Sequence, residues 1–118
     1  MAVWLALVIA VSISPLSFKL KLHTVGAYHD FGHYAVYTVT ALLLWLAGRH
    51  WFGRMFTFSL GVGLAFAQEW AENKLYHAGF EWRDIGTDLA GLVSGYALMV
   101  MIVTLMTDEG APGRRYPR

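Results

Sequence analysis

The stretch HDFGHYAVYTVTALLLWLAG, residues 29–48, decides the fold. It opens with two histidines and an aspartate and continues as an apolar run. A helix needs about 20 mostly apolar residues to cross a bilayer core, so residues 32–48 predict a short transmembrane helix. Titratable groups at the start of such a helix are costly to place near lipid, so they are candidates for a function.

The composition of the whole chain also favours a lipid bilayer as its surroundings. Of the 118 residues, 57% are hydrophobic and only 14% are charged. A small soluble domain has a high surface-to-volume ratio and cannot bury that much apolar surface. We therefore expect an integral membrane protein with one domain.

The residue types that are missing exclude several functions. The chain contains no cysteine, which excludes disulfides, thiolate metal sites and a cysteine nucleophile. The net charge is +1, and this argues against a nucleic-acid partner, because such proteins carry a basic stripe.

Four apolar stretches predict an all-α protein, a four-transmembrane-helix bundle in up-down-up-down order. The predicted helices cover residues 2–20, 32–48, 55–76 and 85–106. They form one transmembrane domain over residues 1–107, followed by a polar tail at residues 108–118. Pro15 interrupts the first stretch, which transmembrane helices tolerate. A cleaved signal peptide is the weaker interpretation, because no Lys or Arg precedes the apolar run.

The basic residues predict the orientation, because cytoplasmic loops carry an excess of Lys and Arg. One predicted face holds Arg49, Arg54 and the three arginines of the tail. The opposite face holds four basic residues: Lys19, Lys21, Lys74 and Arg83. This bias favours cytoplasmic termini in a bacterial inner membrane.

Acidic residues converge on the face opposite the termini. Six of the eight acids belong to this group: Asp30, Glu69, Glu72, Glu81, Asp84 and Asp88. They open the second predicted helix, close the third and open the fourth, so connectivity alone brings them to one membrane face. His33 lies at the same face, and the loop before the fourth helix contributes His77.

The spacing places these side chains in pairs on shared helical faces. Asp30 with His33 and Glu69 with Glu72 are three residues apart, and Asp84 with Asp88 are four apart. The last face continues through the two glycines of a G-x-x-x-G pattern, Gly91 and Gly95, which lets a neighbouring helix approach closely.

Ordinary structural roles account for part of this cluster. Asp30 and Asp84 complement the dipole at a helix N-terminus, and the glutamates could form a solvated helix end. Asp88 is different, since it lies one turn inside the apolar run and must point into the bundle. Acids in that position are candidates for function.

Three chemistries fit the cluster, and the residues alone do not rank them. Carboxylates with an imidazole could bind a divalent cation, with four candidate ligands: Asp30, His33, Glu69 and Asp84. Crowded carboxylates with His33 could form an acid–base site. The group could also recognise a polar head group or a partner helix.

The order of the motifs resembles the VanZ-like family of small membrane proteins. The segments are D30-F-G-H33-Y, Q68-E-W-A-E72 and D84-IGT-D88-LA-G91-LVS-G95, and they span about residues 29–97. Family members commonly have Lys where this chain has Phe31, Gln at Glu72, Asn at Asp88 and a basic residue near Gly79. This chain is therefore more acidic than the family pattern.

The resemblance implies a role at the cell envelope, where the named family member is linked to resistance to the lipoglycopeptide teicoplanin. We expect a protein that binds or modifies a polar lipid or lipid-linked head group through the acidic and histidine residues; whether it catalyses a reaction stays open. The alternative is a small accessory subunit of a larger membrane complex, or a homo-oligomer. Trp residues near the predicted helix ends suit either lipid anchoring or subunit contacts.

Overall fold

The computed structural model describes residues 2–12, 28–77 and 79–109. Within these ranges the backbone forms four helices and no strand, so the predicted all-α class is confirmed for this part of the chain. The helices are α1 (Ala2–Ser12), α3 (His29–Ala47), α4 (Trp51–Tyr76) and α5 (Trp82–Glu109).

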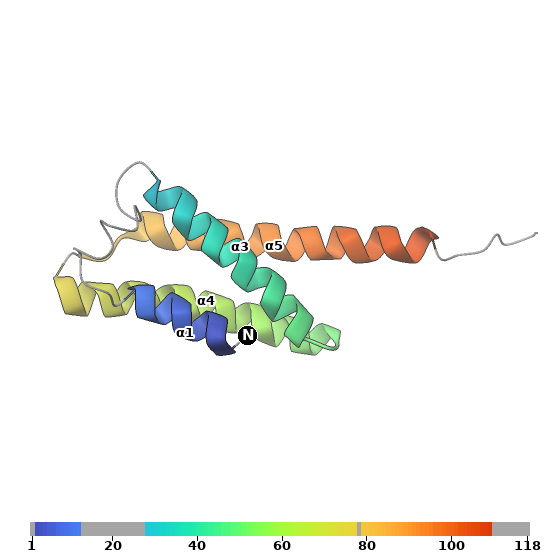
Figure 1. Cartoon of the computed structure of the whole chain (residues 1–118), viewed down its shortest axis with the longest axis horizontal. Coiled ribbons are helices and arrows are strands. Elements are labelled where there is room, and N and C mark those ends of the chain that lie inside the picture. The colour runs from blue at the N-terminus through green and yellow to red at the C-terminus, as the bar shows by residue number, and fades with distance from the viewer. Residues whose placement is uncertain (1, 13–27, 78, 110–118) are drawn as a thin grey trace, which may run out of the picture.

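Consecutive helices run in opposite directions, in the predicted up-down-up-down order (Figure 1). α3 lies across α5 and packs against it more extensively than against α4, whereas α1 makes lighter contacts with α3 and α4. The C-terminal end of α5 projects past the other helices (Figure 1). The N-terminal ends of α3 and α5 therefore meet the C-terminal end of α4 at one end of the bundle.

Three helices begin earlier than the apolar runs predicted. α3 starts at His29 where residue 32 was expected, α4 at Trp51 where 55 was expected, and α5 at Trp82 where 85 was expected. The predicted bounds followed the apolar residues alone, but polar first turns are also helical. In α3 and α5 an acid in the first turn, Asp30 or Asp84, complements the helix dipole.

The first predicted helix is described over part of its length. α1 accounts for residues up to Ser12, and the predicted continuation to residue 20, with Pro15, lies outside the described residues. The indole N–H of Trp4 donates to the Thr40 hydroxyl at 2.9 Å. Val8 is buried. These contacts attach α1 to the side of the bundle.

The turn between α3 and α4 comprises three residues, 48–50, and is shorter than the gap of residues 49–54 between the predicted helices. Gly48 ends α3 in an extended conformation and donates its N–H to the Leu44 and Trp45 carbonyls. A Cβ atom on Gly48 would lie 2.8 Å from the backbone nitrogen of Arg54. This close approach requires glycine, since real Cβ atoms do not come so near to backbone.

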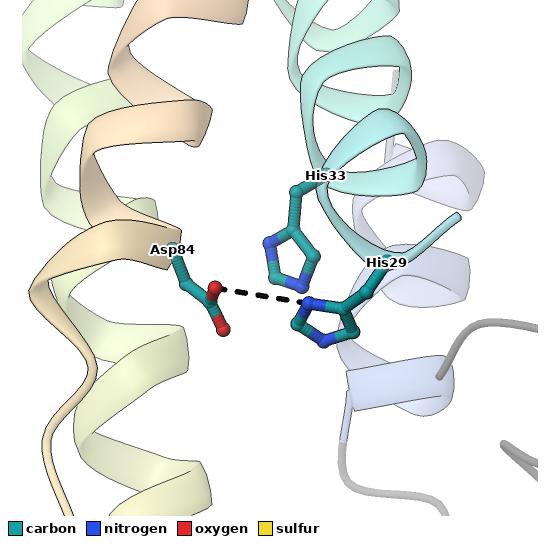
Figure 2. A group of neighbouring side chains, drawn as sticks. All are labelled: His29, His33 and Asp84. Atoms are coloured by element: carbon teal, nitrogen blue, oxygen red, sulfur yellow. Dashed lines mark ion pairs between the residues drawn. The ribbon is translucent and has the colours of Figure 1, made fainter. Parts of the chain in front are cut away.

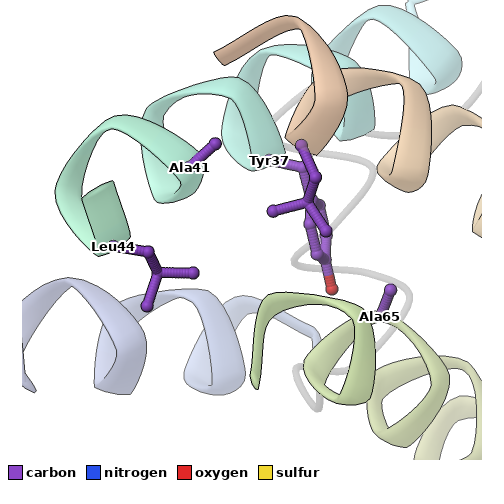
Figure 3. Close-up of a cluster of buried hydrophobic side chains, with 5 residues drawn as sticks. Tyr37, Ala41, Leu44 and Ala65 are labelled. Carbon is purple, nitrogen blue, oxygen red and sulfur yellow. The ribbon is translucent and has the colours of Figure 1, made fainter. Parts of the chain in front are cut away.

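The hydrophobic core is small and sits between three helices (Figure 3). It consists of Tyr37, Ala41 and Leu44 from α3, Ala65 from α4 and Leu92 from α5. Many large apolar side chains face outward instead, along all four helices. More large apolar side chains are therefore exposed on the described helices than are buried in the core.

One described helix is long and apolar enough to cross a membrane, and it is Trp82–Thr107 within α5. The predicted set of four spans is thus supported for one helix. α3 and α4 carry polar side chains within their helical ranges, among them His33 and Glu69, and these lower their mean hydropathy. Four crossing helices remain part of the proposal below.

Candidate functional site

The candidate site lies where α3 and α5 begin and α4 approaches its end. Its centre is a pair between helices: Nδ1 of His33 lies 2.8 Å from Oδ1 of Asp88. Asp88 is buried, with 2% of its surface exposed. A buried carboxylate needs a strong partner, and the imidazole supplies a charge-assisted hydrogen bond. The prediction that Asp88 points into the bundle agrees with this burial.

A second histidine joins the pair. The rings of His29 and His33 lie one turn apart on α3, with centroids 4.6 Å apart. Nδ1 of His29 is 3.7 Å from Oδ1 of Asp84, which is also buried. Figure 2 shows both rings and the carboxylate turned toward a common point. Ligand atoms from these three residues all lie within 4.8 Å of one another.

Asp30 lies at the rim of this group. Its carboxylate pairs with the guanidinium of Arg83, and its other oxygen is 3.9 Å from Nδ1 of His29. The Arg83 side chain is mostly exposed. Asp30 was a predicted metal ligand, but it is not one of the three residues whose ligand atoms converge.

Glu69 has a structural partner. It is 6% exposed, and its Oε1 accepts the backbone N–H of Glu81 at 2.6 Å. This bond ties the loop before α5 to α4. Glu69 was also a predicted metal ligand, and it too lies outside the converging group. Glu72 is half-buried, and its charge acts on His33 and Asp88.

His77, which the sequence also placed at this face, ends α4 in a left-handed conformation with φ of 52°. Its backbone N–H donates to the Asn73 carbonyl. The backbone of His77 therefore acts as a helix cap, and its side chain is exposed.

Gly91 and Gly95 lie where α3 crosses α5. A Cβ atom on Gly91 would be 2.5 Å from the Tyr34 carbonyl oxygen, and one on Gly95 would be 2.5 Å from the Cβ of Ala41. Any larger residue would push the helices apart. The stripe that carries Asp84 and Asp88 is thus also the stripe that packs closely on α3.

His29 is the site residue that sequence reasoning missed. The signal was available, because His29 and His33 are four residues apart and share a helical face. The predicted pairs join His33 to Asp30, three residues away, and leave out the four-residue spacing to His29. With α3 starting at His29, the two imidazoles become neighbours.

No protein-family model, curated protein or solved structure matches this chain. The VanZ-like resemblance therefore rests on the order and spacing of its own motifs.

Proposed function

We propose that this chain is an integral membrane protein of the VanZ-like kind, which binds or modifies a polar lipid or lipid-linked head group at the cell envelope. The observation that carries the proposal is the position of the His33–Asp88 pair. Asp88 is buried inside the helix that can cross a membrane, and its partner His33 comes from α3. Ionisable groups in such a position are costly and are retained for a function.

The surface of the bundle supports a membrane setting. Most of the α5 span is exposed rather than buried, unlike the core helix of a soluble protein. Large apolar side chains are also exposed on α1, α3 and α4, for example Leu7, Phe31 and Phe56. We propose that all four helices contact lipid, with α3 and α4 burying their polar residues at the site.

The depth of the site fits a head group. His29 is the first residue of α3, and Asp84 lies in the first turn of α5. A head group at the membrane interface would meet these side chains without entering the apolar layer. We place this end on the extracytoplasmic side, because the basic residues favour cytoplasmic termini. A link to teicoplanin-type resistance belongs to the same proposal.

The absence of cysteine gives a direct test of topology. A single cysteine at Glu81, which is exposed at the site end, is expected to react with a membrane-impermeant maleimide on intact cells. A single cysteine at Arg49, in the turn at the opposite end, is expected to react only after permeabilisation. Equal labelling of both positions before permeabilisation would contradict the proposed crossing.

Lipid binding is tested by extracting lipids from protein released gently from its own membrane. We expect wild type to retain a lipid class that an Asp84→Asn/Asp88→Asn double variant loses. Glu81→Gln is the matched control, an exposed acid at the same end. Retention of the same lipid by the double variant would refute a head-group site.

The second candidate is an accessory subunit, and one observation favours it. All side chains from Met101 to Thr107 are exposed, where α5 projects beyond α3 and α4 (Figure 1). A partner helix could cover this apolar surface. If wild type and the double variant retain the same lipids and both co-purify with one larger membrane protein, the subunit role replaces the head-group role.

A further inference from the structure

Three side chains at the site have the donor types of a transition-metal centre. His29 and His33 come from the first turn and a half of α3, and Asp84 comes from the first turn of α5. Their ligand atoms lie within 4.8 Å of one another. Two imidazoles with one carboxylate suit Zn²⁺ and similar divalent ions, whereas Mg²⁺ and Ca²⁺ prefer oxygen ligands alone.

Asp88 orients one of the imidazoles as metal sites require. Nδ1 of His33 lies 2.8 Å from the buried Asp88 carboxylate, and a neutral imidazole that donates from Nδ1 has its lone pair on Nε2. Figure 2 shows Nε2 of His33 directed toward His29 and Asp84. A carboxylate behind a ligating histidine fixes its tautomer and raises its basicity.

One separation between ligand atoms is close to that expected around a bound Zn²⁺ ion. Ligands at about 2.0–2.1 Å from a tetrahedral Zn²⁺ lie about 3.3 Å from each other. The distance from His29 Nδ1 to Asp84 Oδ1 is 3.7 Å, too long for a hydrogen bond but near that value. His29 is at the start of α3, and rotation of its side chain needs no change in the buried pair.

The charges at this end also favour a cation. Asp84 and Asp88 are both buried, one turn apart on α5, and the charges of Asp84 and Glu72 both act on Asp88. Arg83 pairs with Asp30 at the rim. A divalent ion would compensate the buried carboxylates at their centre.

We infer that His29, His33 and Asp84 bind one Zn²⁺ ion, with Asp88 as the residue that positions His33. Three protein ligands leave one tetrahedral position open, as in zinc sites that bind a substrate. The open position takes a phosphate oxygen of the head group; this last step rests on the function proposed above. The zinc site itself does not.

The test uses the full-length protein in detergent, stripped with a chelator and titrated with Zn²⁺. We expect one tightly bound ion per chain by elemental analysis, lost in His29→Ala and in Asp84→Asn. His50→Ala is the matched control, an exposed histidine in the turn at the opposite end. Asp88→Asn is expected to weaken binding by about 10- to 100-fold, the usual effect of removing a partner of a ligating histidine.

Co²⁺ gives a second measurement, which reports the coordination geometry of the bound ion. The cobalt form is expected to show the intense visible bands of four-coordinate Co²⁺ in wild type and in His50→Ala, and to lose them in His29→Ala. His29 lies outside the buried pair, so this variant keeps the His33–Asp88 contact. Unchanged zinc content and spectra in His29→Ala and Asp84→Asn would overturn the site.

The two proposals fail in different ways. If zinc binds as expected but inorganic phosphate and the co-purified lipid leave the cobalt spectrum unchanged, the open position does not hold a phosphate and only the head-group step fails. If a lipid is lost in the Asp84→Asn/Asp88→Asn variant while no protein binds zinc, the metal site fails and the head-group function stands.

Discussion

The two ends of the bundle both carry polar side chains between helices, but they are built differently. At the turn end, the hydroxyls of Thr57 and Tyr96 are 2.9 Å apart, and the Tyr96 hydroxyl donates to the Arg54 carbonyl. Nε of Arg54 donates to the Gly48 carbonyl, and its guanidinium lies 4.1 Å above the Trp45 ring. The donors of this network are thus satisfied by backbone carbonyls at the turn.

At the site end, one of the two histidine–aspartate contacts is a hydrogen bond and the other is too long to be one. His33 and Asp88 are within hydrogen-bonding distance, whereas His29 and Asp84 stop at 3.7 Å. The two histidine rings lie side by side at this gap, tilted by 44° to each other (Figure 2). A network that satisfies its own donors stabilises a fold, whereas donors that converge without meeting leave room for a ligand.

The largest effect on stability is expected from breaking the His33–Asp88 contact at the site end. His33→Leu leaves the Asp88 carboxylate buried without its partner, which should destabilise the fold by about 3–5 kcal/mol. The double variant His33→Leu/Asp88→Leu should recover most of this loss, because apolar replacement of a buried pair is often neutral. Unfolding in mixed micelles measures both. A double variant that loses the sum of the single effects would show that the pair is not coupled.

The next effect concerns the crossing that holds the site end together. Gly91→Val puts side-chain atoms against the Tyr34 carbonyl, so we expect a loss of about 1–3 kcal/mol from overpacking. Zinc binding should fall with it, because α3 and α5 supply the ligands. Gly86→Ala on the same helix is the control, since nothing lies within 4 Å of its added Cβ. Equal stability of the two variants would contradict the close crossing.

A smaller effect is expected at the turn end. Tyr96→Phe removes the hydroxyl between Thr57 and Arg54, at a cost of about 0.5–1.5 kcal/mol for a hydrogen bond. Zinc affinity and bound lipid should stay as in wild type, because this network is structural. A loss of either without a loss of stability would mean that the two ends are linked in function.

The smallest effect is expected at the rim of the site. Arg83→Gln removes the exposed pair with Asp30, which should change stability by less than about 1 kcal/mol. High salt should remove the difference, because exposed pairs are screened. Thermal unfolding at low and high salt measures it. A large effect that survives in high salt would assign Arg83 a structural role that its exposure does not suggest.

The sequence predicted the features that follow from local pattern. Apolar runs located the helices, and connectivity with three- and four-residue spacing brought the acids to one end. The G-x-x-x-G pattern marked the stripe where α3 and α5 cross, because glycine has no side chain and lets another helix approach closely.

The features that were missed depend on contacts between distant residues. The bond from the Glu81 backbone to Glu69 follows the path of a loop, and no spacing rule describes that path. Arg83 reaches Asp30 across 53 positions of sequence. His29 is different, because its four-residue spacing to His33 is a local pattern, but the predicted pair joined His33 to Asp30 instead.

Native mass spectrometry of the intact protein from its own membrane tests most directly whether the site end of the bundle holds a ligand. We predict that wild type carries the mass of one zinc ion and one lipid on the same chain, and that His29→Ala/Asp84→Asn carries neither while His50→Ala carries both. Wild type and the double variant with identical bound masses would contradict the account.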